Sequence, residues 1–331
     1  MTELEFYNTK KIKKYAPDAV LDFICGKRRI GKTDYFLKEA FEQWDKHRYQ
    51  TVWMRNKKVE FSDDGFQLNF LSDPINFGWA SEDYFINKDG VFTDKTKEEC
   101  IIQFQAISTF SNRRSAGASK EVIQMVLDEM MPEDRRYPNR CHTGLMSLIK
   151  SILDGREGTM CYCLSNYISV ANPYFVGYEI YPNRKLDVTY FPDKGIAIEI
   201  CRGYKQSIPK SSPWNKVFDA GKYQNYDDGT EDSLFSLVEP VPKGGTLNRW
   251  FIYHNGVTYG STRKNGLVYW HKCPPNSEYI YATTLQEVSD KIRRMPSFVK
   301  KELQIQLDAN ALRFQNENVL FIVMNILFNE I

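Results

Sequence analysis

The sequence predicts an α/β fold in which a mainly parallel sheet carries helices on both faces, followed by a smaller α+β domain. In the first half of the chain, short apolar runs alternate with segments of helical periodicity, as expected where crossovers join parallel strands. After residue 245 the apolar runs are joined by Asn-Gly dipeptides, the strongest short signal for an antiparallel hairpin. The length of 331 residues, with 42% hydrophobic and 26% charged residues, suits two globular domains.

Apolar runs in the first domain predict strands that are buried on both faces, and the first run is broken only by Asp22. The predicted strands are residues 20–25, 51–54, 101–107, 122–127 and 160–164. Residues 36–44 and 144–153 show the spacing of helices with one buried face. Between the second and third strands, the polar stretch 60–99 contains a hairpin signal at 87–90 and is interpreted as an insertion outside the core.

The character of the chain changes near residue 203, where prolines, glycines and serines replace any sustained periodicity. Short strands joined by two Asn-Gly turns then predict an antiparallel meander, and two helical stretches close the chain. The predicted strands are 249–253, 257–261 and 267–271, and the predicted helices are 285–295 and 298–328, the second one broken. The expected division is a domain at 1–202, a linker or small subdomain at 203–232, and a C-terminal domain at 233–331.

Charge and cysteine usage restrict the possible functions. The formal charge is only +2, from 44 basic and 42 acidic residues, so a nucleic-acid contact would need local clusters or a ring of subunits. The seven scattered cysteines argue for a reducing compartment, and the four histidines form no pair at metal-ligand spacing. The longest apolar run, residues 319–328, is too short to span a bilayer, so a cytosolic protein without a membrane partner is expected.

A phosphate-binding loop follows the first strand, with the pattern G-x-x-x-x-G-K-T. Two glycines at its ends would let the backbone N–H groups converge on phosphates at the positive end of the next helix. Lys32 would contact the β- and γ-phosphates, and the Thr33 hydroxyl would be a ligand of Mg²⁺. The loop therefore predicts binding of ATP with Mg²⁺ by Gly26, Lys27, Arg28, Arg29, Ile30, Gly31, Lys32 and Thr33.

Two adjacent acids end the strand at 122–127. Asp128 is expected to complete the Mg²⁺ shell, and Glu129 to hold and activate the attacking water. A glutamate in this position favours hydrolysis over simple nucleotide sensing. Together with the loop, the pair predicts an ASCE-type P-loop NTPase.

Other polar residues near the sheet leave alternatives open. Ser165 and Asn166 end the strand at 160–164 and would either sense the γ-phosphate or form a simple turn. Arg156 lies in a loop just before that strand, where the residues alone favour a solvated arginine over one that reaches a neighbouring subunit. The basic pairs Arg113-Arg114 and Lys57-Lys58 would contact phosphates or simply be solvated.

These motifs together resemble the DNA-packaging ATPases, or encapsidation proteins, of small podoviruses that replicate by protein priming, which are relatives of the ATPase of large terminases. The resemblance covers nearly the whole chain. It is carried by Phe6-Tyr7-Asn8, the phosphate loop, Leu127-Asp128-Glu129, Cys161-x-Cys163-Leu164-Ser165-Asn166, Ser169-Val170 and Asn172-Pro173-Tyr174-Phe175.

The resemblance implies a five-membered ring on the portal of the procapsid, which hydrolyses ATP between subunits and pushes double-stranded DNA inward. It implies that Arg156 is an arginine finger offered in trans and that Arg114 is a second basic residue acting across the interface. Lys58, beside Lys57, falls where the family places a DNA-gripping lysine. The protein would act in the host cytoplasm and transiently on the procapsid, without remaining in the mature virion, and some members dock on a structural packaging RNA.

The resemblance also implies that the C-terminal domain is an RNase H-like nuclease that has lost its activity. The residues agree, because such a nuclease needs carboxylates on its first strand and residues 249–253 contain none. The departures from the family pattern are the charged Lys27, Arg28 and Arg29 in the loop, and an arginine at the second basic position.

Two other functions remain as alternatives. One is a helicase or replication-type ATPase acting on single-stranded nucleic acid, and the other is a nucleotide-binding scaffold without useful turnover. A nucleotide monophosphate kinase is a poor fit, because no arginine-rich lid follows the sheet.

Overall fold

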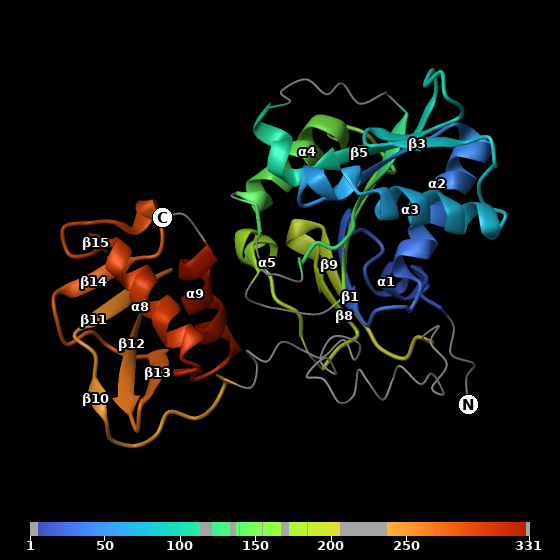
Figure 1. Ribbon diagram of the computed structural model, residues 1–331. Helices are drawn as coiled ribbons and strands as arrows, with labels where there is room; N and C mark the ends of the chain where they lie inside the picture. The colour runs from blue at the N-terminus through green and yellow to red at the C-terminus, as the bar shows by residue number, and fades with distance from the viewer. Residues whose placement is uncertain are drawn as a thin grey trace. The chain divides into compact units, whose positions relative to one another are not determined.

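The computed structural model describes residues 6–112, 121–132, 137–138, 140–153, 155–166, 172–183, 185–205 and 237–328. The chain forms two compact units (Figure 1). The first unit comprises residues 1–168 and 182–230, and the second comprises residues 169–181 and 231–331. None of the helices in the described ranges is long and apolar enough to cross a membrane.

The first unit is built on a nine-stranded sheet with the order β3-β4-β5-β2-β6-β7-β1-β9-β8. The six central strands, β5, β2, β6, β7, β1 and β9 in spatial order, are parallel to one another, and antiparallel strands extend the sheet at both edges. The strands are β1 (Leu21–Gly26), β2 (Gln50–Arg55), β3 (Phe85–Asn87), β4 (Gly90–Phe92), β5 (Cys100–Ala106), β6 (Val122–Leu127), β7 (Met160–Ser165), β8 (Val188–Phe191) and β9 (Ile196–Cys201). The mainly parallel sheet and all five strands predicted from apolar runs are confirmed.

Helices pack on this sheet as the periodicity predicted. In α2 (Lys32–His47), the buried Phe36, Ala40 and Trp44 join one apolar cluster with side chains of the central strands. Helix α4 (Cys141–Leu153) packs against β6, and none of its buried side chains belongs to that cluster. The remaining helical segments are α1 (Lys10–Tyr15), η1 (Lys58–Ser62), α3 (Asp64–Asn76), η2 (Ile107–Asn112) and η3 (Pro192–Lys194).

The interpretation of residues 60–99 as an insertion outside the core is wrong. The expected hairpin at 87–90 is present, but its strands β3 and β4 extend the main sheet. Helix α3 and the preceding turn bury Phe61 and Phe70 in the same cluster as α2, and the Phe61 and Phe104 rings stack with centroids 4.6 Å apart. A few widely spaced aromatic residues thus provide core contacts that the polar composition obscured.

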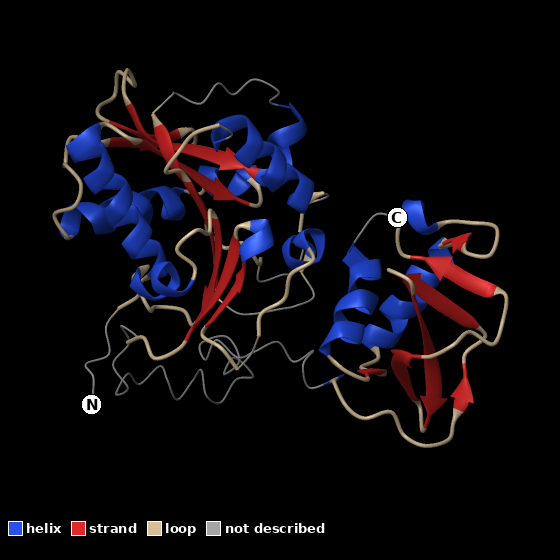
Figure 2. Ribbon diagram, turned by 180° about the vertical axis from the view of Figure 1, so that it is seen from behind, coloured by secondary structure: helices blue, strands red, loops and turns tan. Residues whose placement is uncertain are grey.

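Strands also form the centre of the second unit (red in Figure 2), with the order β15-β14-β11-β12-β13-β16 and β10 paired to β12. The predicted meander is confirmed as β11-β12-β13, and both turns contain Asn-Gly with positive φ, 47° and 80° in the first and 51° and 79° in the second. The strands are β10 (Thr246–Leu247), β11 (Trp250–His254), β12 (Val257–Lys264), β13 (Leu267–Lys272), β14 (Tyr279–Ala282), β15 (Arg293–Arg294) and β16 (Leu312–Phe314).

The helices of the second unit differ from the prediction in two places. Instead of a helix at 285–295, a single turn η5 (Leu285–Glu287) is followed by β15, because Val288 is extended and Arg293 pairs with β14. The stretch 298–328 is broken, as predicted, into α8 (Ser297–Asp308) and α9 (Glu317–Phe328), with β16 between them. Asn310, with φ of 52°, turns the chain out of α8.

Residues 172–181 belong to the second unit by their contacts, although the sequence placed 1–202 in one domain. Asn172 caps α5 (Pro173–Tyr178) by accepting hydrogen bonds from the next two free N–H groups, so a new helix begins there. Helix α5 packs on α9, and the Tyr181 ring lies 5.6 Å from that of Phe321.

Candidate nucleotide site

Four parallel strands end at the same edge of the first sheet and bring the candidate site together. The phosphate loop follows β1, and Asp128 and Glu129 follow β6. Strand β7 lies between these two strands and leads to Asn166, while β2, on the other side of β6, ends at Arg55. Carboxyl ends of parallel strands are where ligands bind in open α/β sheets.

The two glycines of the loop have different roles. Gly31 has a φ of 84° and directly precedes α2, so it supplies the left-handed turn that starts the helix. Gly26 is the last residue of β1, and a Cβ there would lie only 2.5 Å from the Cβ of Cys201 on β9. Gly26 therefore provides room for a neighbouring strand, whereas the sequence interpretation gave it a part in the curl of the loop. The other residue of the loop with a left-handed backbone conformation is Arg29, whose φ is 61°.

Lys32 lies across the inside of the loop and is only 5% exposed. Its Nζ donates hydrogen bonds to the carbonyl oxygens of Gly26 at 3.0 Å and Lys27 at 2.7 Å, and to Oδ1 of Asn166 at 3.4 Å. Burial lowers the pKa of Lys32. A phosphate would favour the charged form again, because an anion nearby stabilises an ammonium group. The structure thus brings Asn166 to the loop, as expected for a residue at the end of β7.

Thr33 and Asp128 lie side by side, although they come from different parts of the chain. The Thr33 hydroxyl donates to Oδ1 of Asp128 at 3.3 Å, and Asp128 is 4% exposed. A hydroxyl and a single carboxylate fit Mg²⁺, which prefers oxygen ligands and is held by few protein groups together with phosphates and water. Within the described ranges there is no cluster of three or more His, Cys, Asp or Glu residues that would suit another metal.

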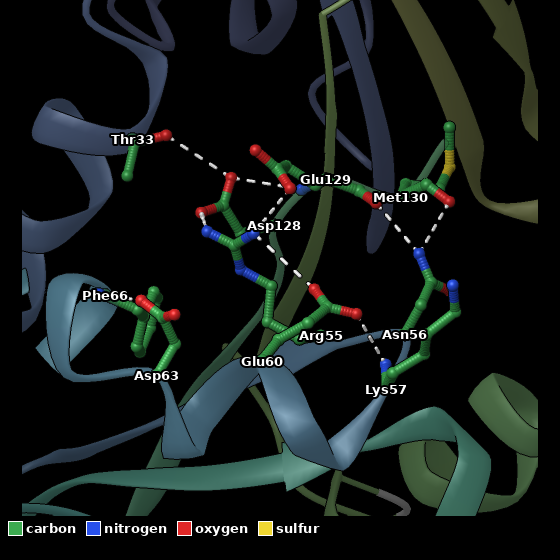
Figure 3. A network of polar contacts seen from close by, with 10 residues as sticks. All are labelled: Thr33, Arg55, Asn56, Lys57, Glu60, Asp63, Phe66, Asp128, Glu129 and Met130. Atoms are coloured by element: carbon green, nitrogen blue, oxygen red, sulfur yellow. Dashed lines mark hydrogen bonds and ion pairs between the residues drawn. The ribbon is translucent and has the colours of Figure 1, made fainter. Parts of the chain in front are cut away.

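Arg55 is a site residue that the sequence analysis missed. Its guanidinium donates to Oδ2 of Asp128 at 3.0 Å and to Oε2 of Glu129 at 2.6 Å, so it contacts both the predicted Mg²⁺ ligand and the predicted catalytic base (Figure 3). It also lies 3.7 Å from Glu60 and 5.1 Å from the centre of the Phe66 ring. Burial acts to lower the pKa of Arg55, but the three carboxylates outweigh it and raise the pKa.

Glu129 is held at both its main chain and its side chain. Its φ is 52°, and its carbonyl oxygen accepts a hydrogen bond from the Asn56 side chain at 2.9 Å (Figure 3). The same Asn56 amide donates to the carbonyl of Met130 at 3.1 Å. The backbone of Glu129 is therefore fixed, while Oε2 of its carboxylate is paired with Arg55.

The predicted DNA-contacting lysines follow directly after Arg55 and Asn56. Lys57 is half-buried, and its backbone N–H donates to Oε1 of Glu60 at 2.9 Å. Lys58 is exposed and begins η1. Since Glu60 also faces Arg55, the segment that carries both lysines is connected to the acids of the site.

Arg156, one of the two arginines predicted to act in trans, does not lie at this site. The guanidinium of Arg156 donates to the carbonyl of Val122 at 3.2 Å, at the opposite end of β6 from Asp128. A six-residue strand is about 20 Å long, so this arginine does not reach its own chain's loop. Arg114, with Arg113, lies outside the described residues.

Comparisons with known proteins show the family of the chain. Residues 1–329 match the model of the family described as podovirus DNA encapsidation protein (Gp16). Curated relatives include the DNA packaging protein of Bacillus phage phi29, 22% identical over 334 residues, covering 94% of each chain. That of Bacillus phage B103 is 25% identical over 326 residues, covering 91% of this chain and 94% of the relative.

Two solved structures share the fold over nearly the full length. The phi-28 gp11 DNA packaging motor superposes with a TM-score of 0.70 at 18% identity, covering 98% of each chain. The phi-29 genome packaging motor assembly gives a TM-score of 0.67 at 23% identity, covering 97% of each chain. Taken with the family match along almost the entire sequence, these findings show that the chain belongs to the podovirus DNA encapsidation protein (Gp16) family.

Proposed function

We propose that this protein is the ATPase of a DNA-packaging motor and uses ATP hydrolysis to drive double-stranded DNA into a procapsid. The observation that carries the proposal is the convergence of Lys32, Thr33, Asp128 and Glu129 at one sheet edge in a member of the encapsidation family. Phosphoryl transfer needs a phosphate-binding loop, a divalent cation and acids beside them, since its catalysis consists mostly of positioning and charge stabilisation.

Each residue has a distinct part in the proposed reaction. The N–H groups of the loop and the Lys32 ammonium bind and orient the triphosphate, and Asn166 senses its γ-phosphate. Thr33 and Asp128 would hold Mg²⁺, which would supply positive charge to the phosphates. Glu129 accepts a proton from the attacking water.

Residues from a neighbouring subunit complete the proposed site. Arg156 lies far from its own loop, which suits a finger that neutralises transition-state charge on an adjacent subunit's nucleotide. Arg114 is proposed as the second basic residue across that interface. The assembly would be a homo-oligomeric ring, five-membered by resemblance, on the portal of a procapsid in the host cytoplasm, and a structural packaging RNA is a further proposed partner.

Exposed Lys58 and its neighbour Lys57 are proposed to contact the DNA backbone in the channel of the ring. Their segment follows β2 directly, so movement of Arg55 at the acids would reach it through two residues. This connection gives a physical route from the state of the nucleotide to the grip on DNA.

The C-terminal domain is proposed to have no nuclease activity. Its strand β11 carries the sequence WFIYH, which offers no carboxylate for a metal ion. Mg²⁺-dependent nicking of plasmid DNA by the full chain, lost when residues 246–331 are deleted, would contradict this.

The function is tested by measuring ATP hydrolysis and filling of purified procapsids with the full chain. Lys32→Ala should abolish both, and Lys46→Ala at the exposed end of the same helix is the matched control. Double-stranded DNA should stimulate hydrolysis more than single-stranded DNA. The reverse preference, without procapsid filling, would instead support a helicase, and binding of ATP without turnover would support a scaffold.

A further inference from the structure

The N-terminal segment and strand β9 contact the phosphate loop at its two ends. The backbone N–H of Tyr7 donates to the carbonyl of Ile30 at 2.8 Å, and Phe6 lies against Gly31. At the other end, the side chain of Cys201 fills the space next to Gly26. Two segments that are distant in the sequence therefore bracket the loop.

One buried carboxylate joins these two segments. Glu199 on β9 lies two residues before Cys201 and is fully buried. Its Oε2 accepts the Tyr7 hydroxyl at 3.4 Å, and its Oε1 accepts the Tyr204 hydroxyl at 3.0 Å. Tyr7 is itself 3% exposed, and its ring lies 5.3 Å from that of Tyr204. Each oxygen of Glu199 thus has one tyrosine hydroxyl as its donor.

The periphery of this cluster is closed by Lys11 on α1. Its Nζ lies 3.0 Å from Oδ2 of Asp187, donates to the carbonyl of Arg202 at 3.2 Å and sits 5.0 Å from the centre of the Tyr204 ring. These contacts connect α1 to Asp187, which precedes β8, and to Arg202, which follows β9. The N-terminal segment is therefore held at Lys11 as well as at Tyr7.

We propose that Tyr7, Glu199 and Tyr204 form a latch that holds the phosphate loop in the shape required for nucleotide, and that these three are positioning residues for ATP binding. The proposal rests on the proposed function, in which the loop binds ATP. The amides of the loop must converge on the phosphates, and the bond from Tyr7 fixes the carbonyl at the turn before Gly31. Without the latch, each binding event must also order the loop, which lowers affinity.

The latch should respond to pH because its central group is a buried acid. Burial raises the pKa of Glu199 to about 7, against the opposing effects of the hydrogen bond from Tyr204, of Lys11 and of the hydrogen bond from Tyr7. The titratable groups that face Glu199 are Tyr7, Lys11, Asp22, Cys25, Asp187, Cys201 and Tyr204. Above this pKa the carboxylate accepts both hydroxyls, and hydrogen bonds to a charged acceptor are roughly twice as strong as neutral ones.

The test compares Tyr7→Phe, Tyr204→Phe and Glu199→Gln in the full chain, with binding of a fluorescent ATP analogue and steady-state hydrolysis as readouts. Tyr84→Phe is the matched control, because its hydroxyl also donates to a carboxylate, Asp45, at 3.2 Å, but away from the loop. At pH 8, Tyr7→Phe and Glu199→Gln should weaken binding about ten-fold, equivalent to about 1.4 kcal/mol, and raise KM more than they lower kcat. Tyr204→Phe should weaken binding less, because it leaves the direct link from Glu199 to Tyr7 intact.

The pH dependence separates a latch from a general loss of stability. Between pH 8 and pH 6 the wild type should lose affinity more steeply than Glu199→Gln, since the titration of the nucleotide itself is common to both. Wild-type affinity in Tyr7→Phe and Glu199→Gln, or equal pH profiles for wild type and Glu199→Gln, would overturn the latch while leaving the ATPase intact. Failure of the wild type to bind the analogue would overturn the proposed function and the latch together.

Discussion

Asp22 offers a quantitative test of the buried acids beneath the site. Asp22 belongs to β1 and is 2% exposed, and its Oδ1 has no hydrogen-bond partner among the residues that the structure describes. Burial, together with the nearby Glu199, raises its pKa to about 8 against the opposing effect of Lys13. Asp22→Asn keeps the shape of the side chain and removes the titration.

The effect of pH on the stability of the wild type follows from the difference between the pKa of Asp22 in the folded and unfolded states. Because the folded pKa is raised, the folded state holds a proton that the unfolded state has released, so stability is full below the unfolded pKa near 4 and is lost as pH rises toward 8. Between these values the free energy of unfolding falls by about 1.4 kcal/mol per pH unit, so the loss from pH 5 to pH 7 is on the order of 3 kcal/mol. Asp22→Asn cannot release this proton, so its stability does not fall with pH for this reason.

Thermal unfolding at pH 5 and pH 7 measures the difference directly. The melting temperature of Asp22→Asn minus that of the wild type should rise by roughly 5–10 °C between the two pH values. Asp83→Asn, which replaces an exposed aspartate of the same unit, should show no such change. A difference that stays constant from pH 5 to pH 7, or that favours the wild type at pH 7, would show that Asp22 does not hold a proton in the folded protein at pH 7.

Three further predictions concern the nucleotide site. Arg55→Met keeps an apolar side chain next to Phe66 but removes the guanidinium that pairs with Asp128. It should therefore destabilise the first unit by about 3–5 kcal/mol and uncouple ATP hydrolysis from DNA movement. A variant with the melting temperature and packaging activity of the wild type would contradict this. Gly26→Ala should abolish nucleotide binding through the clash with Cys201, and adding Cys201→Gly should restore part of it; equal binding by Gly26→Ala and the wild type would argue against the close approach. Rings made only of Arg156→Ala should hydrolyse ATP about 10³-fold more slowly or worse, whereas normal turnover in such rings would exclude a finger in trans.

Much of the first sheet could be predicted because parallel strands that are buried on both faces have nearly continuous apolar sequences. The strand at 122–127 was placed to the residue, and its carboxyl end correctly located Asp128 beside Thr33. Strands β8 and β9 were missed, because the four residues of β8 are only partly buried and Glu199 interrupts the apolar run of β9. Residues 285–295 were misjudged because helical spacing over so few residues does not outweigh pairing with β14.

The parts of the site that the sequence could not reveal depend on pairings between distant segments. Arg55 becomes a partner of Glu129 only because β2 lies next to β6, and Gly26 is restricted only because β9 brings Cys201 beside it. A signal for Arg55 did exist, since a charged residue at the end of a buried strand points to the ligand edge of a sheet. No comparable signal marks Glu199, whose role depends on tyrosines at both ends of the unit.

We propose that this edge of the sheet binds ATP through Lys32 and hydrolyses it through Glu129. The most direct test of this proposal is a single-turnover measurement with radiolabelled ATP on Glu129→Gln and Lys32→Ala in the presence of double-stranded DNA. Glu129→Gln should retain bound ATP but release phosphate at least about 10²-fold more slowly, and Lys32→Ala should bind no ATP. Phosphate release by Glu129→Gln at the wild-type rate, or undiminished binding by Lys32→Ala, would contradict the proposal.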